Sequence, residues 1–270
     1  MKTQDEKVYT LKGRGKLKED KLLVGDFVDI DEKQLVIEKL LPRKNKLVRP
    51  PLANVEQALI VVAPMPKPDF LLIDKLLIKF LLSKITPVVV INKLDLCSGV
   101  FVDEIVKQYK PICDVEMISA LDERMTQTIL NPILSGKLSI LTGQSAVGKT
   151  SILNCLLHGN MAVGELSKAG RGKNTTRHSE IFMLENSGLI ADTPGFNALD
   201  TEFSPEDVLD CYLEFKPYAK KCKYKNCNHI NEKLEDCIVK QKVKDGTLSA
   251  PRYERYLKLV EQAKEEGKFE

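Results

Sequence analysis

The stretch Gly143-Gln144-Ser145-Ala146-Val147-Gly148-Lys149-Thr150-Ser151 decides the fold of this chain. It matches a phosphate loop, in which a glycine and four further residues precede Gly-Lys-Thr. The apolar residues 138–142 before it predict a buried strand, and residues 151–157 after it predict an apolar helix. In this setting the backbone N–H groups of the loop and the helix N-terminus form a nest for anionic phosphate. The alternative, a turn that ends in Lys-Thr by chance, is disfavoured because the whole pattern lies between a strand and a helix.

Three side chains form the predicted catalytic set. Lys149 is expected to reach the β- and γ-phosphates, and the Thr150 hydroxyl is expected to bind Mg²⁺. Asp192 ends an apolar segment, residues 189–191, and would supply the carboxylate of the magnesium shell, usually through water. A plain turn after a strand is the alternative for Asp192-Thr193-Pro194-Gly195.

Two further groups are expected at the γ-phosphate. The backbone N–H of Gly195 can donate to it. One threonine of the pair Thr175-Thr176, in the basic residues 168–178, closes the magnesium shell when the γ-phosphate is present. The sequence does not decide between the two threonines. Both remain candidates, and we assign the magnesium-binding role to Thr176.

A second motif, Asn92-Lys93-Leu94-Asp95, predicts guanine specificity. It follows the apolar residues 87–91, which predict a buried strand. A carboxylate there can accept hydrogen bonds from the guanine ring N–H and exocyclic amine, a donor pair that adenine lacks. The pair Ser119-Ala120 ends the next predicted strand and can contact the guanine O6 through backbone N–H. The predicted GTP-binding residues are therefore Asn92, Lys93, Leu94, Asp95, Ser119, Ala120, residues 143–151 and Gly195.

Strands and helices alternate from residue 52 onward, which predicts an α/β domain with a mainly parallel sheet and its ligand at the carboxyl ends of the strands. The expected strands are residues 58–62, 87–91, 115–118, 138–142, 181–184 and 189–191, and the expected helices are residues 70–82, 101–109, 123–129 and 151–157. The guanine motif precedes the phosphate loop, whereas Ras-like GTPases have the reverse order. This order indicates a circularly permuted GTPase domain.

Both flanks of this domain differ from it in pattern. Residues 1–50 hold short β-like pieces at 8–11, 26–30, 35–40 and 46–48, which predict a small antiparallel barrel or open sheet. Arg49-Pro50-Pro51 makes a stiff exit from it. Ser204-Pro205 predicts a helix start, and a last helix is expected over residues 252–264. We expect three domains: residues 1–51, OB-fold-like and all-β; 52–204, the permuted P-loop GTPase domain; and 205–270, a helical zinc-binding domain.

The third region holds Cys222, Cys227, His229 and Cys237. Three thiolates and one imidazole satisfy a tetrahedral Zn²⁺, and a full ligand shell indicates a structural rather than a catalytic ion. Three cysteines and a histidine within sixteen residues of a reduced chain disfavour chance or disulfides. An unliganded, lysine-rich loop is the alternative. The four scattered cysteines (97, 113, 155 and 211) are expected to pack as small apolar residues.

Composition and charge narrow the class. A chain of 270 residues with 43% hydrophobic residues can bury a sizeable core in two or three domains. The net charge of +3 names no partner, but basic patches at residues 12–21, 43–49, 168–178 and 216–225 can hold phosphate backbone. For each patch, solvated surface lysines without a partner are the alternative. With no signal-peptide core and no run of 18 apolar residues, we expect a reduced, cytoplasmic protein without a membrane partner.

Together these motifs resemble the bacterial ribosome-small-subunit-dependent GTPase family. The resemblance covers nearly the whole chain, including the segment from Arg49 to Gln57, the permuted motifs, Asp192-Thr193-Pro194-Gly195-Phe196 and the zinc cluster. It implies an OB-fold, a central GTPase domain and a zinc domain. It also implies hydrolysis of GTP to GDP, stimulated by the small ribosomal subunit, and rRNA contacts from both flanking domains. We expect a monomer with one structural Zn²⁺ and with Mg²⁺ bound alongside GTP.

Four departures from the family pattern matter. Ala146 stands where the loop usually has glycine, which a negative φ would tolerate. Asn174 replaces the histidine that the family usually has before the threonine pair. The catalytic role of that histidine is therefore not carried over to this chain. The zinc spacing before Cys237 is two residues longer, so residues 230–236 should bulge. Sequence for the first OB strand is lacking, which predicts an incomplete barrel.

Two other function classes compete. A metabolic P-loop enzyme such as an ATP-dependent kinase is disfavoured by Asp95 and its motif. A non-hydrolysing RNA-binding module that senses guanine nucleotide is disfavoured by the intact Lys149, Thr150 and Asp192.

Overall fold

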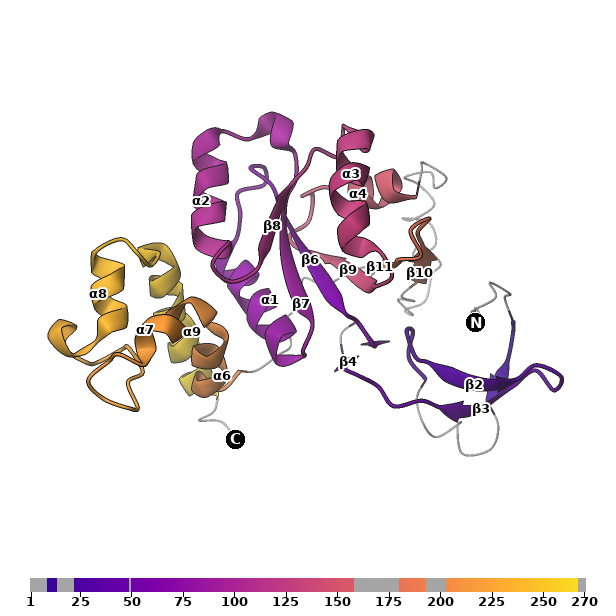
Figure 1. Ribbon diagram of the computed structural model, residues 1–270, viewed down its shortest axis with the longest axis horizontal. Helices are drawn as coiled ribbons and strands as arrows, with labels where there is room; N and C mark the ends of the chain where they lie inside the picture. The colour runs from indigo at the N-terminus through magenta and orange to yellow at the C-terminus, as the bar shows by residue number, and fades with distance from the viewer. Residues whose placement is uncertain (1–8, 14–21, 49, 158–179, 193–202, 267–270) are drawn as a thin grey trace.

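The computed structural model describes residues 9–13, 22–48, 50–157, 180–192 and 203–266 (Figure 1). Its centre is a six-stranded sheet with the order β10-β11-β9-β6-β7-β8. The strands are β6 (Gln57–Val62), β7 (Thr86–Ile91), β8 (Asp114–Met117), β9 (Leu138–Thr142), β10 (Glu180–Met183) and β11 (Leu189–Asp192). Every neighbouring pair is parallel except β10 and β11. The predicted parallel α/β sheet is confirmed.

Helices cover both faces of this sheet. They are α1 (Phe70–Leu82), α2 (Gly99–Tyr109), α3 (Glu123–Leu134) and α4 (Lys149–Leu156). One core cluster joins the sheet to α1 and α2, and a second joins its other face to α3 and α4. All six residues of β6 are buried, and the five after Gln57 are apolar, as a strand covered on both faces requires.

Most of these elements lie where the sequence predicts them, but α3 is longer. It extends beyond the expected residues 123–129 to Leu134, with Pro132 inside its last turn. Leu130 and Leu134, four residues apart, are fully buried in the core. The burial of this apolar face outweighs the hydrogen bond that the proline ring removes.

The N-terminal residues form a small sheet with the order β1-β3-β2. Its strands are β1 (Lys12–Gly13), β2 (Val28–Asp31) and β3 (Val36–Leu40). β2 and β3 are antiparallel as expected, whereas β1 is parallel to β3 and starts after the predicted residues 8–11. Arg43 donates to both carboxylate oxygens of Asp26, at 2.7 and 2.8 Å, which fixes the turn before β2. An OB-type barrel stays a prediction.

A short hairpin links this sheet to the central domain. β4 (Lys46–Leu47) pairs with β5 (Leu52–Ala53) across the Pro50-Pro51 segment. Leu47 and Leu52 are buried in the same core cluster as β6. The domain division at residue 51 stays a prediction, and strand pairing joins the two regions across it.

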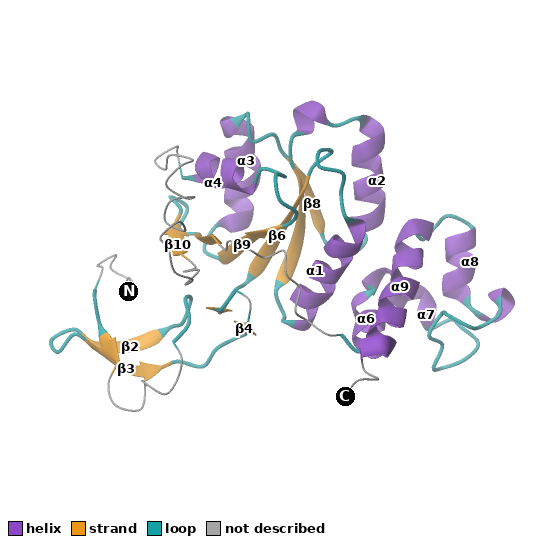
Figure 2. Ribbon diagram, turned by 180° about the vertical axis from the view of Figure 1, so that it is seen from behind, coloured by secondary structure: helices purple, strands orange, loops and turns teal. Residues whose placement is uncertain are grey.

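The C-terminal region is helical and packs beside α1 in both views (Figures 1 and 2). Its helices are α6 (Pro205–Cys211), α7 (Lys216–Ala219), α8 (Ile238–Lys244) and α9 (Ala250–Glu266). Ser204 caps α6, as the sequence predicts, and the structure adds a capping box with Asp207. Among the described residues, every helix is too short or too polar to span a bilayer.

Candidate nucleotide and metal sites

The carboxyl ends of the parallel strands bring the separate sequence motifs to one edge of the sheet. The phosphate loop leaves β9, the guanine motif leaves β7, and Ser119-Ala120 follows β8. Asp192 ends β11, the neighbour of β9, and only its backbone is described. Thr175, Thr176 and Gly195 lie outside the described residues.

Two glycines shape the phosphate loop. Gly143 has φ +126°, and a Cβ there would lie 2.3 Å from the Val61 carbonyl oxygen. Gly148 has φ +98°, and a Cβ there would lie 2.3 Å from Nδ2 of Asn92. Both positions therefore require glycine for conformation and for space. The cradle that results fits a polyphosphate, which needs close approach of backbone N–H groups.

Helix α4 begins at Lys149, directly after the loop, and leaves Thr150 and Ser151 exposed on its first turn. Nζ of Lys149 donates to the carbonyl oxygens of Gly143 and Gln144, at 2.8 and 2.5 Å. The ammonium group thus lies within the loop, in reach of phosphate oxygens that would take the place of the two carbonyls. Ser145 is exposed at the loop's tip.

The backbone conformation of Ala146 differs from the one that the sequence predicts. Its φ is +63°, in the left-handed region, so the negative φ that would accommodate alanine is not found. The Cβ of an L-residue costs roughly 1–2 kcal/mol in that region. The position keeps the geometry of glycine although the side chain is alanine.

The first two residues of the guanine motif hold the phosphate loop. Asn92 is 1% exposed, donates from Nδ2 to the Val147 carbonyl at 2.9 Å, and accepts at Oδ1 from the Ala120 N–H at 3.0 Å. Nζ of Lys93 donates to the carbonyl of Ala146 at 2.8 Å and to that of Met65 at 2.8 Å. Both residues therefore act as positioning groups, because their polar atoms are used within the protein.

Asp95 is the member of the motif that remains open to a base. Its side chain is exposed, and its Oδ1 accepts a hydrogen bond of 2.5 Å from the Ser119 hydroxyl. The Leu94 N–H donates to the Ile118 carbonyl at 3.1 Å, which ties the motif to the end of β8. The structure thus brings Asp95, Ser119 and Ala120 together, but the Ala120 N–H, expected at the guanine O6, donates to Asn92 instead.

Sequence reasoning missed the segment that closes the loop on the side of α1. Gln144 accepts from the Asp69 N–H at 2.8 Å and donates to the Lys67 carbonyl at 3.2 Å. Asp69 is also the N-cap of α1 and accepts from the Leu72 N–H at 3.0 Å. The sequence offered one signal, the Pro68-Asp69 pair before an apolar helix. This pair predicts where the helix starts but not that the segment contacts the phosphate loop.

The metal cluster, Cys222, Cys227, His229 and Cys237, is assembled by the fold. Its ligand atoms lie within 4.8 Å of one another. Nδ1 of His229 lies 3.7, 3.1 and 3.4 Å from the three sulfur atoms. A tetrahedral ion with bonds of about 2.3 Å to sulfur and about 2.0 Å to nitrogen separates its ligand atoms by roughly 3.5 Å. The cluster can hold a metal ion, and its donor set fits zinc.

The loop before Cys237 is held by its own hydrogen bonds. Glu232 accepts from the N–H groups of Asn228 and Ile230 at 2.9 and 2.8 Å, and Lys240 donates to two carbonyls of the loop. Tyr253 donates to the His229 carbonyl at 2.6 Å, which fixes a ligand whose φ is +60°. Burial lowers the pKa of His229, which favours the neutral imidazole that a metal requires.

The remaining cysteines behave as small apolar side chains. Cys155 and Cys211 are buried, and Cys97 and Cys113 are half-buried. Burial raises the pKa of Cys113 and that of Cys211 to about 11. Such thiols are protonated at neutral pH and are poor nucleophiles.

Sheet, loop and motifs define a P-loop nucleotide-binding protein in which the guanine motif precedes the phosphate loop. The sequence matches the family model described as RsgA GTPase over residues 40–202. It is 38% identical to the Small ribosomal subunit biogenesis GTPase RsgA of Alkaliphilus metalliredigens, over 98% of this chain and 94% of the relative. Identity to the protein of that name in Mycoplasmopsis pulmonis is also 38%, over 96% of this chain and 94% of the relative.

Two solved structures share the fold. YjeQ from Thermotoga maritima matches with a TM-score of 0.78 and 32% identity, over 96% of this chain and 91% of its own. YloQ, described as a circularly permuted GTPase, matches with a TM-score of 0.77 and 30% identity, over 97% of this chain and 88% of its own. The chain therefore belongs to the RsgA GTPase family.

Proposed function

We propose that this GTPase acts in the maturation of the small ribosomal subunit, as a cytoplasmic monomer that hydrolyses GTP to GDP and phosphate. The observation that carries the proposal is the clamp of Asn92 and Lys93 on the phosphate loop, which leaves Asp95 and Ser119 to read guanine. The names of the relatives supply the assembly process in which the hydrolysis is used.

The residues at the phosphate loop fit a magnesium–GTP complex. Lys149 binds the β- and γ-phosphates, and Thr150, Thr176 and Asp192 hold Mg²⁺, which neutralises charge on the phosphates when bound. Gly195 donates its N–H to the γ-phosphate. Support comes from the position of Lys149 inside the loop, and from Thr150 on the first turn of α4.

The small subunit stimulates this reaction because the chain lacks one catalytic group. Phe196 follows Gly195 in the sequence, where Ras-like GTPases place a glutamine that orients the attacking water. A phenyl ring cannot hydrogen-bond that water. A missing group supplied by a partner is worth roughly 10³–10⁵ in rate in other GTPases.

The flanking domains, residues 1–51 and 205–270, contact rRNA through basic patches. Residues 216–225 carry five lysines and no acid beside the metal cluster. One structural Zn²⁺ on Cys222, Cys227, His229 and Cys237 holds this patch in shape. Phosphate contacts of this kind make affinity for the subunit depend on salt.

Single-turnover hydrolysis tests the proposal. The unmodified protein, alone and with excess purified small subunits, is given GTP or ATP, and Lys149→Ala serves as the inactive control. We expect slow hydrolysis of GTP alone, an increase of roughly 10² or more with subunits, and no turnover of ATP. Equal use of ATP and GTP, or no increase with subunits, would contradict the proposal.

A further inference from the structure

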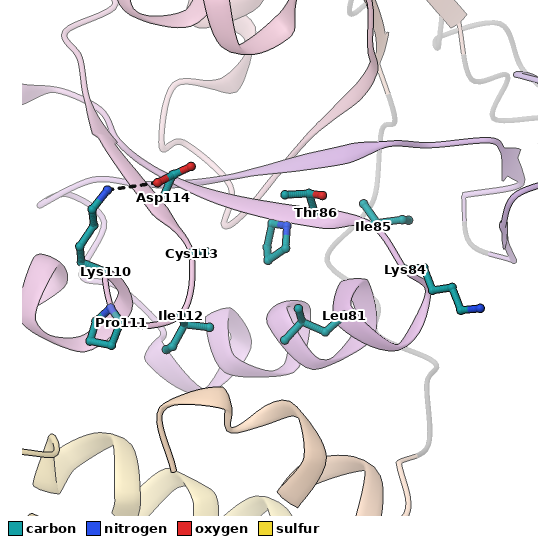
Figure 3. Close-up of a pocket in the computed structure, with 10 residues that line it drawn as sticks. Leu81, Lys84, Ile85, Thr86, Lys110, Pro111, Ile112, Cys113 and Asp114 are labelled. Carbon is teal, nitrogen blue, oxygen red and sulfur yellow. Dashed lines mark hydrogen bonds and ion pairs between the residues drawn. The ribbon is translucent and has the colours of Figure 1, made fainter. Parts of the chain in front are cut away.

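Two adjoining pockets lie at the amino end of the central sheet, on the edge opposite the phosphate loop. Their volumes are about 600 and 460 Å³, and Lys84 and Thr86 line both of them. Figure 3 shows the first pocket, with Lys84 and Lys110 at its opposite ends. We call the two together the amino-edge pockets. Their charged lining residues are Lys44, Lys84, Lys110, Lys137, Glu56 and Asp114.

Positive charge dominates this lining, with four ammonium groups against two carboxylates. Lys110 pairs with Asp114 at 3.1 Å, but their side chains are 55% and 74% exposed. Lys44 pairs with Glu56 at 3.0 Å, and its side chain is 68% exposed. Exposed pairs of this kind contribute little free energy, so the lysines can exchange carboxylate for phosphate at small cost.

Lys84 has no carboxylate partner among the described residues, and its backbone conformation is unusual for lysine. It follows the C-cap of α1 with φ +57°. The N–H of Ile85 donates to the Phe80 carbonyl at 2.9 Å and the Lys84 N–H to the Leu81 carbonyl at 3.1 Å. This pair of bonds is the Schellman motif, whose left-handed position is usually glycine. The chain thus keeps a strained lysine at one of the two residues that line both pockets.

We propose that the amino-edge pockets bind the phosphate backbone of RNA, as a third contact between the two flanking domains. This inference rests on the proposed function and extends it to the GTPase domain itself. Open pockets whose charged lining is mostly lysine, without a buried charged anchor, fit a backbone that passes over them better than an enclosed metabolite.

Position supports the same partner. Lys44 belongs to the basic residues 43–49 of the N-terminal region, so the pockets continue a patch already expected to contact RNA. The N-terminal sheet and the C-terminal helices lie on opposite sides of the central domain (Figures 1 and 2). RNA that touches both flanks from the amino edge of the sheet passes over Lys84 and Lys110.

Substitution of Lys84 by glycine separates binding from folding. Lys84→Gly relieves the left-handed strain, so the full-length protein should unfold at the same or a higher temperature. Its affinity for purified small subunits should fall on the order of fivefold near 0.1 M salt. The negative slope of log K against log salt should become shallower by about 0.7–0.9. Adding Lys110→Gln should make the slope shallower again by a similar amount.

Matched variants and outcomes complete the test. Lys84→Arg keeps the charge and should bind as the unmodified protein does, and so should Arg124→Gln, which removes an exposed charge at the start of α3.

Unchanged affinity and slope in Lys84→Gly would overturn the inference, and so would weaker binding with an unchanged slope, which indicates a contact other than phosphate. If the Lys220→Glu, Lys221→Glu, Lys223→Glu variant loses affinity while Lys84→Gly does not, only this inference fails. If the unmodified protein does not bind subunits, the proposed function fails with it.

Discussion

Three residues of the two sites hold a left-handed backbone without being glycine. They are Lys93, Ala146 and His229, with φ of +59°, +63° and +60°. Each is held by a hydrogen bond that involves it directly: Lys93 donates to the Ala146 carbonyl, and Tyr253 donates to the His229 carbonyl. The strain is stored where a loop must present a ligand-binding group, which is typical of functional sites.

Ala146→Gly should stabilise the protein. The change removes the Cβ from a left-handed position, and the entropy that glycine adds to the unfolded chain offsets part of the gain, which leaves about 0.5–1 kcal/mol. Urea unfolding of the nucleotide-free protein measures this free energy.

The reverse change at Gly136 is the control. Gly136 has φ +67° with open space around the position of a Cβ, so Gly136→Ala should destabilise by a similar amount for the same reason. A lower stability for Ala146→Gly would show that the alanine methyl group contributes packing that its position does not suggest.

Helix α1 connects the GTPase domain to the C-terminal helices through a buried charge network. Asp74 of α1 is fully buried, and its carboxylate accepts from Arg252 and, at 2.6 Å, from Arg255, both on α9. Arg255 also donates to the side-chain oxygen of Gln108 on α2 at 2.7 Å, and Arg252 donates to Glu214. The side chains of Asp74 and Gln108 thus orient α9 against α1 and α2, respectively.

Asp74→Asn should destabilise the full-length protein by about 3–5 kcal/mol, because two buried guanidinium groups lose a counter-charge while the shape of the side chain is kept. Asp114→Asn is the matched control. It breaks the exposed pair with Lys110 and should cost less than about 1 kcal/mol. Denaturant unfolding followed by circular dichroism measures both, and equal effects would mean that the network contributes no more than a surface pair.

At the scale of the whole molecule, the nucleotide site and the metal site lie in different regions. The phosphate loop and guanine motif lie at the carboxyl edge of the sheet, whereas the metal cluster lies between α7 and α8 in the C-terminal region beside α1. The core of those helices includes Cys227 and Cys237, two of the cluster's own ligands. Folding of this small region and metal binding are therefore expected to be coupled.

Metal analysis of protein purified without chelator should give one zinc per chain. Removal of the metal, or Cys237→Ser, should unfold the C-terminal helices and reduce the helical circular dichroism signal. Binding of a fluorescent GDP analogue should persist, because no metal ligand touches the phosphate loop. The control is Cys97→Ser, a cysteine outside the cluster, which should leave both the zinc content and the helical signal unchanged. Much less than one zinc per chain would contradict the expectation.

The sequence by itself determined the elements and the motifs. Continuous apolar runs predict buried parallel strands, and residues 138–142 and 70–82 match β9 and α1 at both ends. Glycine spacing predicts the phosphate loop, and the spacing of three cysteines and a histidine predicts the metal cluster. These signals are readable because each depends on residues close together in the chain.

Tertiary structure alone decided how distant residues use one another. Asn92 and Lys93 hold a loop more than fifty residues away, and Asp74 is paired with arginines 178 and 181 residues further along the chain. The left-handed φ of Ala146 and the position of Lys84 in two pockets also follow from these packings. Local propensity and periodicity carry no information on such contacts, because strand order and helix packing set which side chains meet.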